Sequence, residues 1–296
     1  MIIMKRLTYI IMLALGLMFV SSCNRLDILG MVVNRSDTEA RVTDWLDWND
    51  HNGMPVIDSV PDEYCFYSSS DCHINDDNSR FAKYITAERN DSTAVFSIIA
   101  GDIVNERGEN PFILAEAAMQ YDPAIHADND PCFPIIGNHD LYFDCADHFK
   151  THFHTSTYAV TVKTLGGHQD LYLFLDSGNG THGDRQMKWV EEQLAKRSQY
   201  RYCFVISHSW LFRNTYNYTT TPAANLPEDE TYSFMHLMSE NQVNMVVMGH
   251  FHYRATKTFD GVKYVMTDNL NEDTKPSYMV VTCGDDISYE YRELKE

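Results

Sequence analysis

Short apolar runs and amphipathic stretches alternate along the chain from residue 64 onward. The apolar runs predict buried strands at 64–68, 94–100, 132–136, 201–206 and 243–248. The stretches between them predict helices at 79–89, 111–121, 184–197 and 232–241. This alternation is typical of an α/β domain.

The third predicted helix and the C-terminal region carry additional local signals. Met187, Val190 and Leu194 fall on one face of the helix, and Asp184 is expected to cap its N-terminus. After His252 the helical pattern stops, and turn signals at 260–261 and 284–286 predict hairpins. We expect these hairpins to form a second sheet that closes the domain.

The N-terminus has the pattern of an export signal. A basic pair precedes the apolar stretch 7–20, which is too short to span a bilayer comfortably. Val20, Ser21, Ser22 and Cys23 follow, and they resemble the lipobox at which bacterial lipoproteins are cut and acylated on the cysteine. The resemblance implies a leader at 1–22, lipidation of Cys23 and a lipid-anchored protein. An ordinary secretory signal or an uncleaved anchor are the alternatives.

The resemblance to lipoproteins also implies a location. Asn24 is not the aspartate that commonly retains such proteins at the inner membrane, so we expect an exported protein of the bacterial cell envelope, at the outer membrane.

Residues 23–60 predict a tether and an N-terminal elaboration, with Trp45 and Trp48 packing it down. Residues 61–296 predict one catalytic domain, since 296 residues suffice for one sizeable core.

Composition limits the partners. The formal net charge is -19, and it becomes -21 if the leader is removed with its two basic residues. A long nucleic-acid tract is not expected as a partner because phosphate backbones need a basic footprint. Small phosphorylated substrates remain compatible with this charge, and the acidity also suits a protein kept soluble beside an anionic membrane. The sequence does not indicate an oligomeric state.

Six cysteines remain after Cys23. They are Cys65, Cys72, Cys132, Cys145, Cys203 and Cys283. An even number in an exported chain allows disulfides, but the cysteines within apolar runs are equally compatible with free buried thiols.

Polar patches follow each of the five predicted strands. Their candidate metal ligands are Asp71, His73, Asp102, Asn138, His208, His250 and His252, and His139 lies beside them. Because binding sites in α/β sheets form beyond the carboxyl ends of strands, we expect these side chains to meet in one cleft. Oxygen and imidazole ligands without a cysteine cluster suit a pair of borderline-hard ions that activate water. The sequence therefore predicts a metal-dependent hydrolase.

The ordered set of patches resembles the calcineurin-like metallophosphoesterase family over about residues 64–255. Asp71-x-His73, Gly101-Asp102, the run 137–140, His208 and Gly249-His250-x-His252 carry this resemblance. A further segment, 175–177 followed by 184–194, is similar to the branch with purple-acid-phosphatase-like and class III phosphodiesterase-like members.

The resemblance implies an αββα sandwich of two mixed sheets flanked by helices. It implies two divalent or mixed-valence metal ions, of Mn, Fe, Zn or Co, and a hydroxide shared between them as the nucleophile. One ion is expected on Asp71, His73, Asp102 and His252, and the other on Asp102, Asn138, His208 and His250. His139 is expected to face the substrate.

Some positions depart from the family pattern or admit two interpretations. Residues 105–108 stand where the protein Ser/Thr phosphatases have Asp-Arg-Gly, so the roles of that aspartate and that arginine are not carried over to this chain. Trp210 stands where the family commonly has a proline. Arg254 is a substrate contact or a surface ion pair, and 214–227 is a lid or an ordinary loop. His148, His152 and His154 are interpreted as solvated or capping residues. Phosphomonoesterase, phosphodiesterase and a catalytically inactive binding lipoprotein all remain candidate functions.

Overall fold

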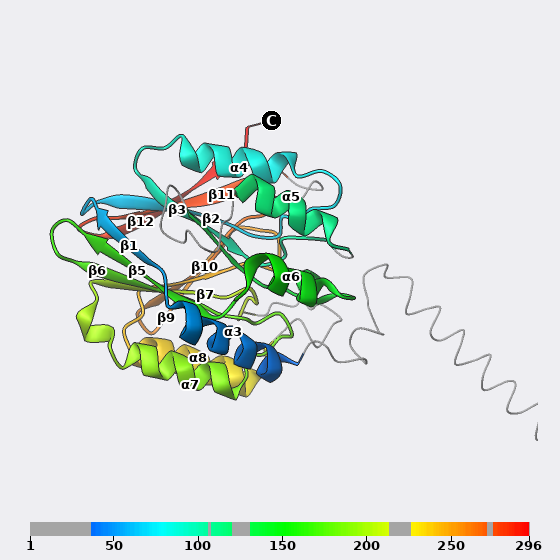
Figure 1. Ribbon diagram of the computed structural model, residues 1–296. Coiled ribbons are helices and arrows are strands. Elements are labelled where there is room, and N and C mark those ends of the chain that lie inside the picture. Colours follow the sequence, from blue (N-terminus) through cyan, green and yellow to red (C-terminus); the bar gives the residue numbers. More distant parts are fainter. Residues whose placement is uncertain (1–36, 106–107, 120–130, 213–225, 271–274, 296) are drawn as a thin grey trace, which may run out of the picture. The chain divides into compact units, whose positions relative to one another are not determined.

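Two mixed β-sheets lie face to face in the computed structural model (Figure 1). The structure describes residues 37–105, 108–119, 131–212, 226–270 and 275–295. These residues belong to one compact unit. Helices cover the outer faces of both sheets, so the layers follow the order α, β, β, α. The predicted αββα sandwich is confirmed.

The five-stranded sheet has the order β12-β11-β2-β3-β4. Its strands are β2 (Tyr64–Ser69), β3 (Ala94–Ala100), β4 (Cys132–Ile135), β11 (Ser277–Cys283) and β12 (Ile287–Glu293). β2, β3 and β4 are parallel, and β11 is antiparallel to β2 and to β12. The carboxyl ends of the three parallel strands therefore lie at one edge of the sheet.

The seven-stranded sheet has the order β1-β5-β6-β7-β8-β10-β9. Its strands are β1 (Val56–Val60), β5 (Tyr158–Thr164), β6 (Gln169–Phe174), β7 (Tyr202–Ile206), β8 (Met245–Met248), β9 (Ala255–Phe259) and β10 (Val262–Met266). β6, β7, β8 and β10 are parallel neighbours, and β9 closes the edge as an antiparallel strand.

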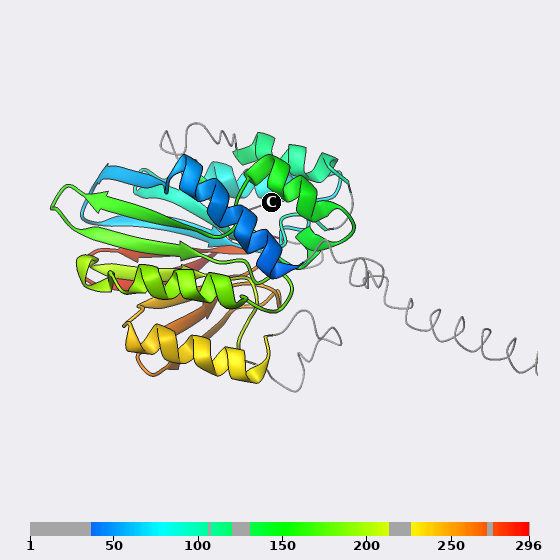
Figure 2. The same cartoon turned by 60° about the horizontal axis from the view of Figure 1, so that its bottom comes forward.

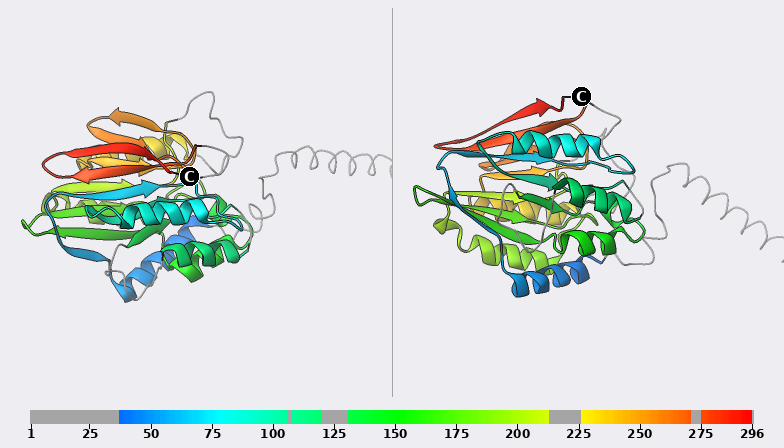
Figure 3. Two further views of the ribbon diagram at one scale, coloured as in Figure 1. Left: turned by 90° about the horizontal axis from the view of Figure 1, so that it is seen from above. Right: turned by 45° about the horizontal axis from the view of Figure 1, so that its top comes forward.

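The helices divide between the two outer faces. They are α3 (Thr38–Asn52), α4 (Ser79–Arg89), α5 (Asn110–Met119), α6 (Cys145–Phe153), α7 (Asp184–Leu194) and α8 (Glu228–Glu240), with short 3-10 turns η2 (His139–Leu141) and η3 (Arg197–Gln199). Figure 2 shows α3, α7 and α8 side by side on the outer side of the seven-stranded sheet. Figure 3 shows α4 and α5 on the opposite side of the molecule, over the five-stranded sheet.

Aromatic side chains fill the space between the sheets. Phe66 and Phe96 stack at 5.2 Å between ring centroids, and Tyr172 stacks on Phe204 at 4.7 Å. Phe66 also meets Tyr172 edge to face at 5.3 Å. Such pairs add about 0.5–1.5 kcal/mol each beyond the burial of their area. This core holds the two sheets together, and with them the loops at their carboxyl ends.

The five strands and four helices predicted from residue 64 onward are all present, with ends shifted by at most four residues. Both C-terminal hairpins also form. They do not build a closing sheet of their own, however, because β9-β10 extends the seven-stranded sheet and β11-β12 extends the five-stranded sheet. Each hairpin finds an open edge with which its backbone can pair, and pairing there satisfies more hydrogen bonds than a separate ribbon would.

The N-terminal elaboration is more structured than the sequence predicts. The predicted domain starts at residue 61, whereas β1 pairs with β5 and α3 packs beside α7. Trp45 is buried against Phe149, as expected for a residue that packs this segment down. Cys23, the predicted leader and residues 214–225 of the predicted lid or loop 214–227 lie outside the described residues. Among the described helices, none combines the length and apolarity needed to cross a membrane.

Two smaller expectations also have clear outcomes. The six cysteines from Cys65 onward are all buried free thiols. Asp184 is the first residue of α7 and not its cap, because the N-cap is Gly183. The side chain of Glu39, on α3, accepts a hydrogen bond from the main-chain N–H of Asp184.

Candidate metal centre

The eight side chains predicted for the site come together beyond five strand ends. They are Asp71 after β2, Asp102 after β3, Asn138 and His139 after β4, His208 after β7, and His250 and His252 after β8, with His73 beside Asp71. Three overlapping groups among them have potential ligand atoms within 4.8 Å of one another. The carboxyl ends of parallel strands from both sheets thus supply one cluster.

One half of the cluster consists of Asp71, His73 and His252. The Nε2 atoms of His73 and His252 are 3.1 Å apart, and Asp71 Oδ1 is 3.1 Å from His252 Nε2. Asp102 Oδ2 lies 3.9 Å from His73 Nε2. Imidazole nitrogens and carboxylate oxygens therefore converge on a small volume, as around a cation.

The other half consists of Asp102, Asn138, His208 and His250. His208 Nε2 lies 3.3 Å from Asp102 Oδ2 and 3.1 Å from Asn138 Oδ1. His250 belongs to the same group of potential ligands. Asp102 is close to both halves, which is the position that a bridging carboxylate requires.

Hydrogen bonds outside the cluster orient several of these side chains. His208 Nδ1 donates to the carbonyl of Ala100 at 2.8 Å, so its Nε2 faces the cluster. Asn138 Nδ2 donates to the hydroxyl of Tyr142 at 3.2 Å, which turns the amide oxygen inward. The Oδ2 atom of Asp71 accepts from the main-chain N–H of His250 at 2.9 Å. Each bond leaves one ligand atom directed toward the cluster.

Buried polar atoms without partners provide a test of whether ions fit. Within the described part of the chain, both ring nitrogens of His250 are buried and have no hydrogen-bond partner. Such atoms cost roughly 1–3 kcal/mol each unless a partner satisfies them. A cation satisfies carboxylate and imidazole acceptors together, and this nitrogen and oxygen set suits Mn, Fe, Zn or Co. The residues present therefore fit divalent ions.

Burial and neighbouring charges shift the pKa values of the carboxylates and histidines in the cluster. Burial acts to raise the pKa of Asp71 and Asp102, but His252 beside Asp71 and His208 beside Asp102 hold both values below the usual range. Burial lowers the pKa of His73 to about 3 and that of His250 to about 4. The cluster thus offers ionised carboxylates and two neutral imidazoles, the forms in which these groups bind metals. Burial acts to lower the pKa of His208 and His252, but Asp102 raises that of His208 to about 10 and Asp71 raises that of His252. An ion that binds these two imidazoles would therefore displace their protons.

The backbone at the cluster is strained. Asp71, His73, Asp102, His250 and His252 have φ angles of 51°, 48°, 54°, 84° and 58°. Non-glycine residues adopt this left-handed region uncommonly, and each such residue costs on the order of 1–3 kcal/mol. The aromatic core and the surrounding hydrogen bonds offset this cost. Strain at five positions that belong to one cluster is typical of a functional site.

Gly101 and Gly137 stand at strand ends where there is no space for a side chain. A Cβ atom on Gly101 would lie 2.5 Å from His208 Nδ1, and one on Gly137 would lie 2.2 Å from Asp102 Oδ1. Both distances are shorter than real contacts. The glycines therefore allow the strand ends to approach closely enough for Asp102 and His208 to meet.

His139 lies at the edge of the cluster. Its ring meets that of His73 edge to face at 4.5 Å, and its Nδ1 donates to the main-chain carbonyl of Asn105 at 2.6 Å. Its main-chain N–H donates to Asp102 Oδ1 at 2.7 Å. No role was predicted for Asn105, because its contribution is a carbonyl oxygen and the sequence carries no signal for a main-chain atom.

Asp140 is a site residue to which the sequence reasoning gave no role. Its buried carboxylate accepts main-chain N–H groups from Gly137 at 2.8 Å and from Val104 at 3.0 Å. It thereby joins the loop after β4 to the loop after β3. Burial, with Asp102 nearby, raises the pKa of Asp140 to about 7. The sequence signal that could have identified Asp140 is its position in the run 137–140.

The remaining sequence candidates have structural partners away from the cluster. Arg254 forms an ion pair with Asp268 at 2.8 Å, which matches the surface-pair interpretation. His152 lies between Glu116 at 2.6 Å and Glu109 at 3.4 Å, and His154 stacks on Trp48. No group of potential metal ligands outside the cluster is found within the described ranges.

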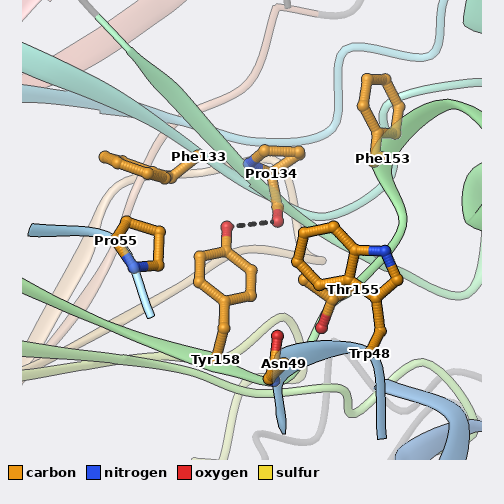
Figure 4. Close-up of a pocket in the computed structure, with 8 residues that line it drawn as sticks. All are labelled: Trp48, Asn49, Pro55, Phe133, Pro134, Phe153, Thr155 and Tyr158. Carbon is orange, nitrogen blue, oxygen red and sulfur yellow. Dashed lines mark hydrogen bonds between the residues drawn. The ribbon is translucent and has the colours of Figure 1, made fainter. Parts of the chain in front are cut away.

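A small cavity lies between α3, β4, β5 and α6, away from the cluster. It has space for about 10 Å³, roughly one water molecule. Figure 4 shows its lining, in which the Tyr158 hydroxyl donates to the Pro134 carbonyl at 2.8 Å. None of the eight site residues lines it, so this cavity is not the substrate site.

Comparisons with known proteins identify the family and the fold. The family profile described as calcineurin-like phosphoesterase matches residues 66–254. No curated protein shows significant sequence similarity to the chain.

Three solved structures share the fold, and each covers 79% of this chain. A dimetal phosphatase from Danio rerio has a TM-score of 0.58 at 12% identity, with 97% of its own chain covered. A purple acid phosphatase from yellow lupin has a TM-score of 0.60 at 14% identity, with 52% of its chain covered. GAP50 of Plasmodium, described as the anchor in the inner membrane complex, has a TM-score of 0.56 at 12% identity, with 85% covered. Because the matched profile spans well over half of the sequence, the chain belongs to the calcineurin-like phosphoesterase family.

Proposed function

We propose that the protein is a two-metal-dependent hydrolase of phosphate esters. Asp71, His73, Asp102 and His252 would hold one ion. Asp102, Asn138, His208 and His250 would hold the other. Two divalent ions in such a site activate a water molecule and neutralise charge on the phosphoryl oxygens. The observation that carries the proposal is the convergence of seven nitrogen and oxygen ligands from both sheets, with both ring nitrogens of His250 buried and without a hydrogen-bond partner among the described residues.

His139 is the proposed catalytic side chain of the protein. The bond from its Nδ1 to the Asn105 carbonyl fixes the ring and leaves Nε2 for the substrate. From the edge of the cluster, Nε2 can donate to a phosphoryl oxygen or hold the proton that the leaving oxygen takes up. The carbonyl of Asn105 supplies the orienting contact, although the Asp-Arg-Gly pattern of the protein Ser/Thr phosphatases is missing here.

We propose a small phosphomonoester or small phosphodiester as the substrate. The net charge of -19 supports this choice over a long nucleic acid. The leader and lipobox pattern support export to the bacterial cell envelope with a lipid anchor at Cys23, so the substrates would be those outside the cytoplasm.

A binding role without hydrolysis is the competing proposal. The fold alone does not require catalysis, since GAP50 shares it and is described as an anchor. The complete ligand set favours the hydrolase, because a protein released from catalysis has no reason to keep five strained ligand positions.

The test is hydrolysis of p-nitrophenyl phosphate and bis-p-nitrophenyl phosphate by the full chain in detergent, stripped of metal and reloaded with Mn(II). Asp102→Asn is the inactivating variant, and Asp285→Asn, at an exposed turn, is the matched control. Turnover that needs both metal and Asp102, but not Asp285, would establish the hydrolase. Absence of turnover of either ester by folded, metal-loaded protein would favour the binding role.

A further inference from the structure

Helix α3 lies outside the region that matches the family profile, yet it contacts the loop that supports the metal centre. The profile begins at residue 66, and α3 ends at Asn52. The helix packs beside α7 on the outer side of the seven-stranded sheet (Figure 2). Its side chains reach Asp176, in the segment that connects β6 to α7, and Asp184, the first residue of α7.

The principal contact is a buried ion pair between Arg41 and Asp176. Arg41 Nε donates to Asp176 Oδ2 at 2.9 Å, and Nη2 donates to Oδ1 at 3.0 Å. The indole N–H of Trp45 donates to the same carboxylate at 3.1 Å. Asp176 is fully buried and Arg41 is 7% exposed. A two-point Arg–carboxylate pair fixes direction as well as distance, so α3 determines where Asp176 lies.

The main chain of Asp176 is held as firmly as its side chain. Gln186, on α7, accepts from the Asp176 N–H at 2.9 Å and donates to the Asp176 carbonyl at 2.7 Å. Glu39 of α3 accepts from the Asp184 N–H at 2.5 Å at the start of that same helix. The position of this segment therefore depends on α3 at two points.

The next residue, Ser177, transmits this position to a metal ligand. Its Oγ accepts from the main-chain N–H of His208 at 3.1 Å and of Ser209 at 3.0 Å. In return, Ser209 Oγ donates to the Ser177 carbonyl at 3.1 Å. These bonds hold the backbone from which the His208 imidazole extends toward Asp102 and Asn138.

We infer that Arg41 is a positioning residue for the metal centre, acting through Asp176 and Ser177 on His208. The inference rests on the proposed function, because it assumes that His208 binds a metal. Contacts that orient a ligand typically change metal affinity by 10- to 100-fold when they are removed. Loss of the Arg41 contact should therefore weaken the ion on the His208 side and leave the ion on Asp71, His73 and His252 bound.

The chain offers a matched control in Arg201 and Asp170. Arg201 makes the same kind of two-point pair, with Nε to Oδ1 at 3.1 Å and Nη2 to Oδ2 at 2.6 Å, and Asp170 is also fully buried. Asp170 lies at the start of β6, whereas Asp176 follows the end of that strand. Breaking either pair leaves a buried aspartate without its arginine partner, but only Asp176 is adjacent to Ser177.

The experiment is a Mn(II) titration of the stripped full chain in detergent, in which electron paramagnetic resonance measures the free ion. Wild type, Arg41→Met and Arg201→Met are compared, with a thermal midpoint recorded for each. We expect two binding steps in wild type and in Arg201→Met, and a 10- to 100-fold weakening of one step in Arg41→Met. Equal affinities in both variants would overturn the inference, and absence of binding in wild type would overturn the proposed metal centre with it.

A milder variant covers the case in which Arg41→Met does not fold. Trp45→Phe keeps a ring in the core and removes one donor to Asp176, so it should weaken the same step by a smaller factor. A cycle with Ser177→Ala gives the final check, because residues in one chain of contacts are non-additive. The Trp45→Phe effect should shrink in the Ser177→Ala background, and full additivity would contradict transmission through Ser177.

Discussion

His208 Nε2 lies 3.3 Å from Asp102 Oδ2, and this contact joins the two sheets. Asp102 follows β3 of the five-stranded sheet, and His208 follows β7 of the seven-stranded sheet. The contact therefore exists only when the aromatic core has brought the sheets together. A cation held between these groups binds the folded chain and not the unfolded one, so metal binding and folding are thermodynamically linked.

The first prediction follows from this linkage. Removing metal with a chelator should lower the thermal midpoint, and Mn(II) should restore it. An ion at 100 times its dissociation constant contributes about 2.7 kcal/mol, which corresponds to several degrees for a domain of this size. Differential scanning calorimetry measures the shift. Asp102→Asn should show a much smaller response to Mn(II), and an equal response would argue against ions at this position.

The second prediction concerns His139. Replacing it by Gln should lower kcat by about 10²- to 10⁴-fold, the usual contribution of a proton-transferring group. Metal stoichiometry and the thermal midpoint should stay near wild type, since His139 is assigned to the substrate. Steady-state kinetics with metal analysis separate the two effects. Loss of a bound ion in parallel with activity would instead make His139 a ligand.

The third prediction tests the close approach of two strand ends. Gly137→Ala places a Cβ against Asp102 Oδ1 and the Asp102 backbone, which cannot both move aside. We expect a loss of about 1–3 kcal/mol in unfolding free energy and weaker Mn(II) binding. Gly166→Ala is the control, because its Cβ meets only the carboxylate end of Asp62 at 2.4 Å. Chemical denaturation and metal titration of both variants decide whether the crowding is specific to the centre.

The sequence predicts the convergence of the eight side chains well because its signals are local. Each ligand patch directly follows an apolar run, and parallel strands bring their carboxyl ends to the same edge. Asp71 and His250 are thus placed correctly without knowledge of how the two sheets pack. The patches together also carry the family resemblance, which supplies the sandwich itself.

Features that depend on distant pairing were not predictable in this way. Arg41 and Asp176 are 135 positions apart, and nothing in the polar sequence around Arg41 indicates a buried partner. The N-terminus of α7 is similar: local preference favours Asp184 as the cap, whereas Glu39 reaches it from another helix. The sequence predicts β1 as part of a tether, because the burial of this strand depends on its pairing with β5.

The last prediction concerns His182, a buried histidine outside the set of proposed ligands. Its Nε2 is hydrogen-bonded to Ser207 Oγ at 3.0 Å, and its ring stacks on Phe234 at 4.7 Å. Glu230 faces its Nδ1 at 3.6 Å. Burial lowers the pKa of His182 to about 4, although Asp176 acts in the opposite direction. The folded protein therefore keeps this imidazole neutral.

The sign of the pH effect follows from these values. An unfolded histidine takes up a proton near pH 6.5, and the folded one does so only near pH 4, so the unfolded state binds more protons between them. The contribution of His182 is fully present above about pH 6.5 and is lost as the pH falls toward 4. Between pH 7.5 and pH 5 the loss should be roughly 2 kcal/mol of unfolding free energy.

Comparison with a matched variant isolates this contribution from those of all other groups. Denaturant unfolding at pH 7.5 and pH 5 should show that His182→Gln loses roughly 2 kcal/mol less than wild type over this interval. His236→Gln is the control, because the side chain of His236 is 70% exposed. Its pH dependence should match that of wild type. If His182→Gln and His236→Gln respond alike, the imidazole of His182 is not kept neutral by burial, and protonation must be accommodated through Glu230.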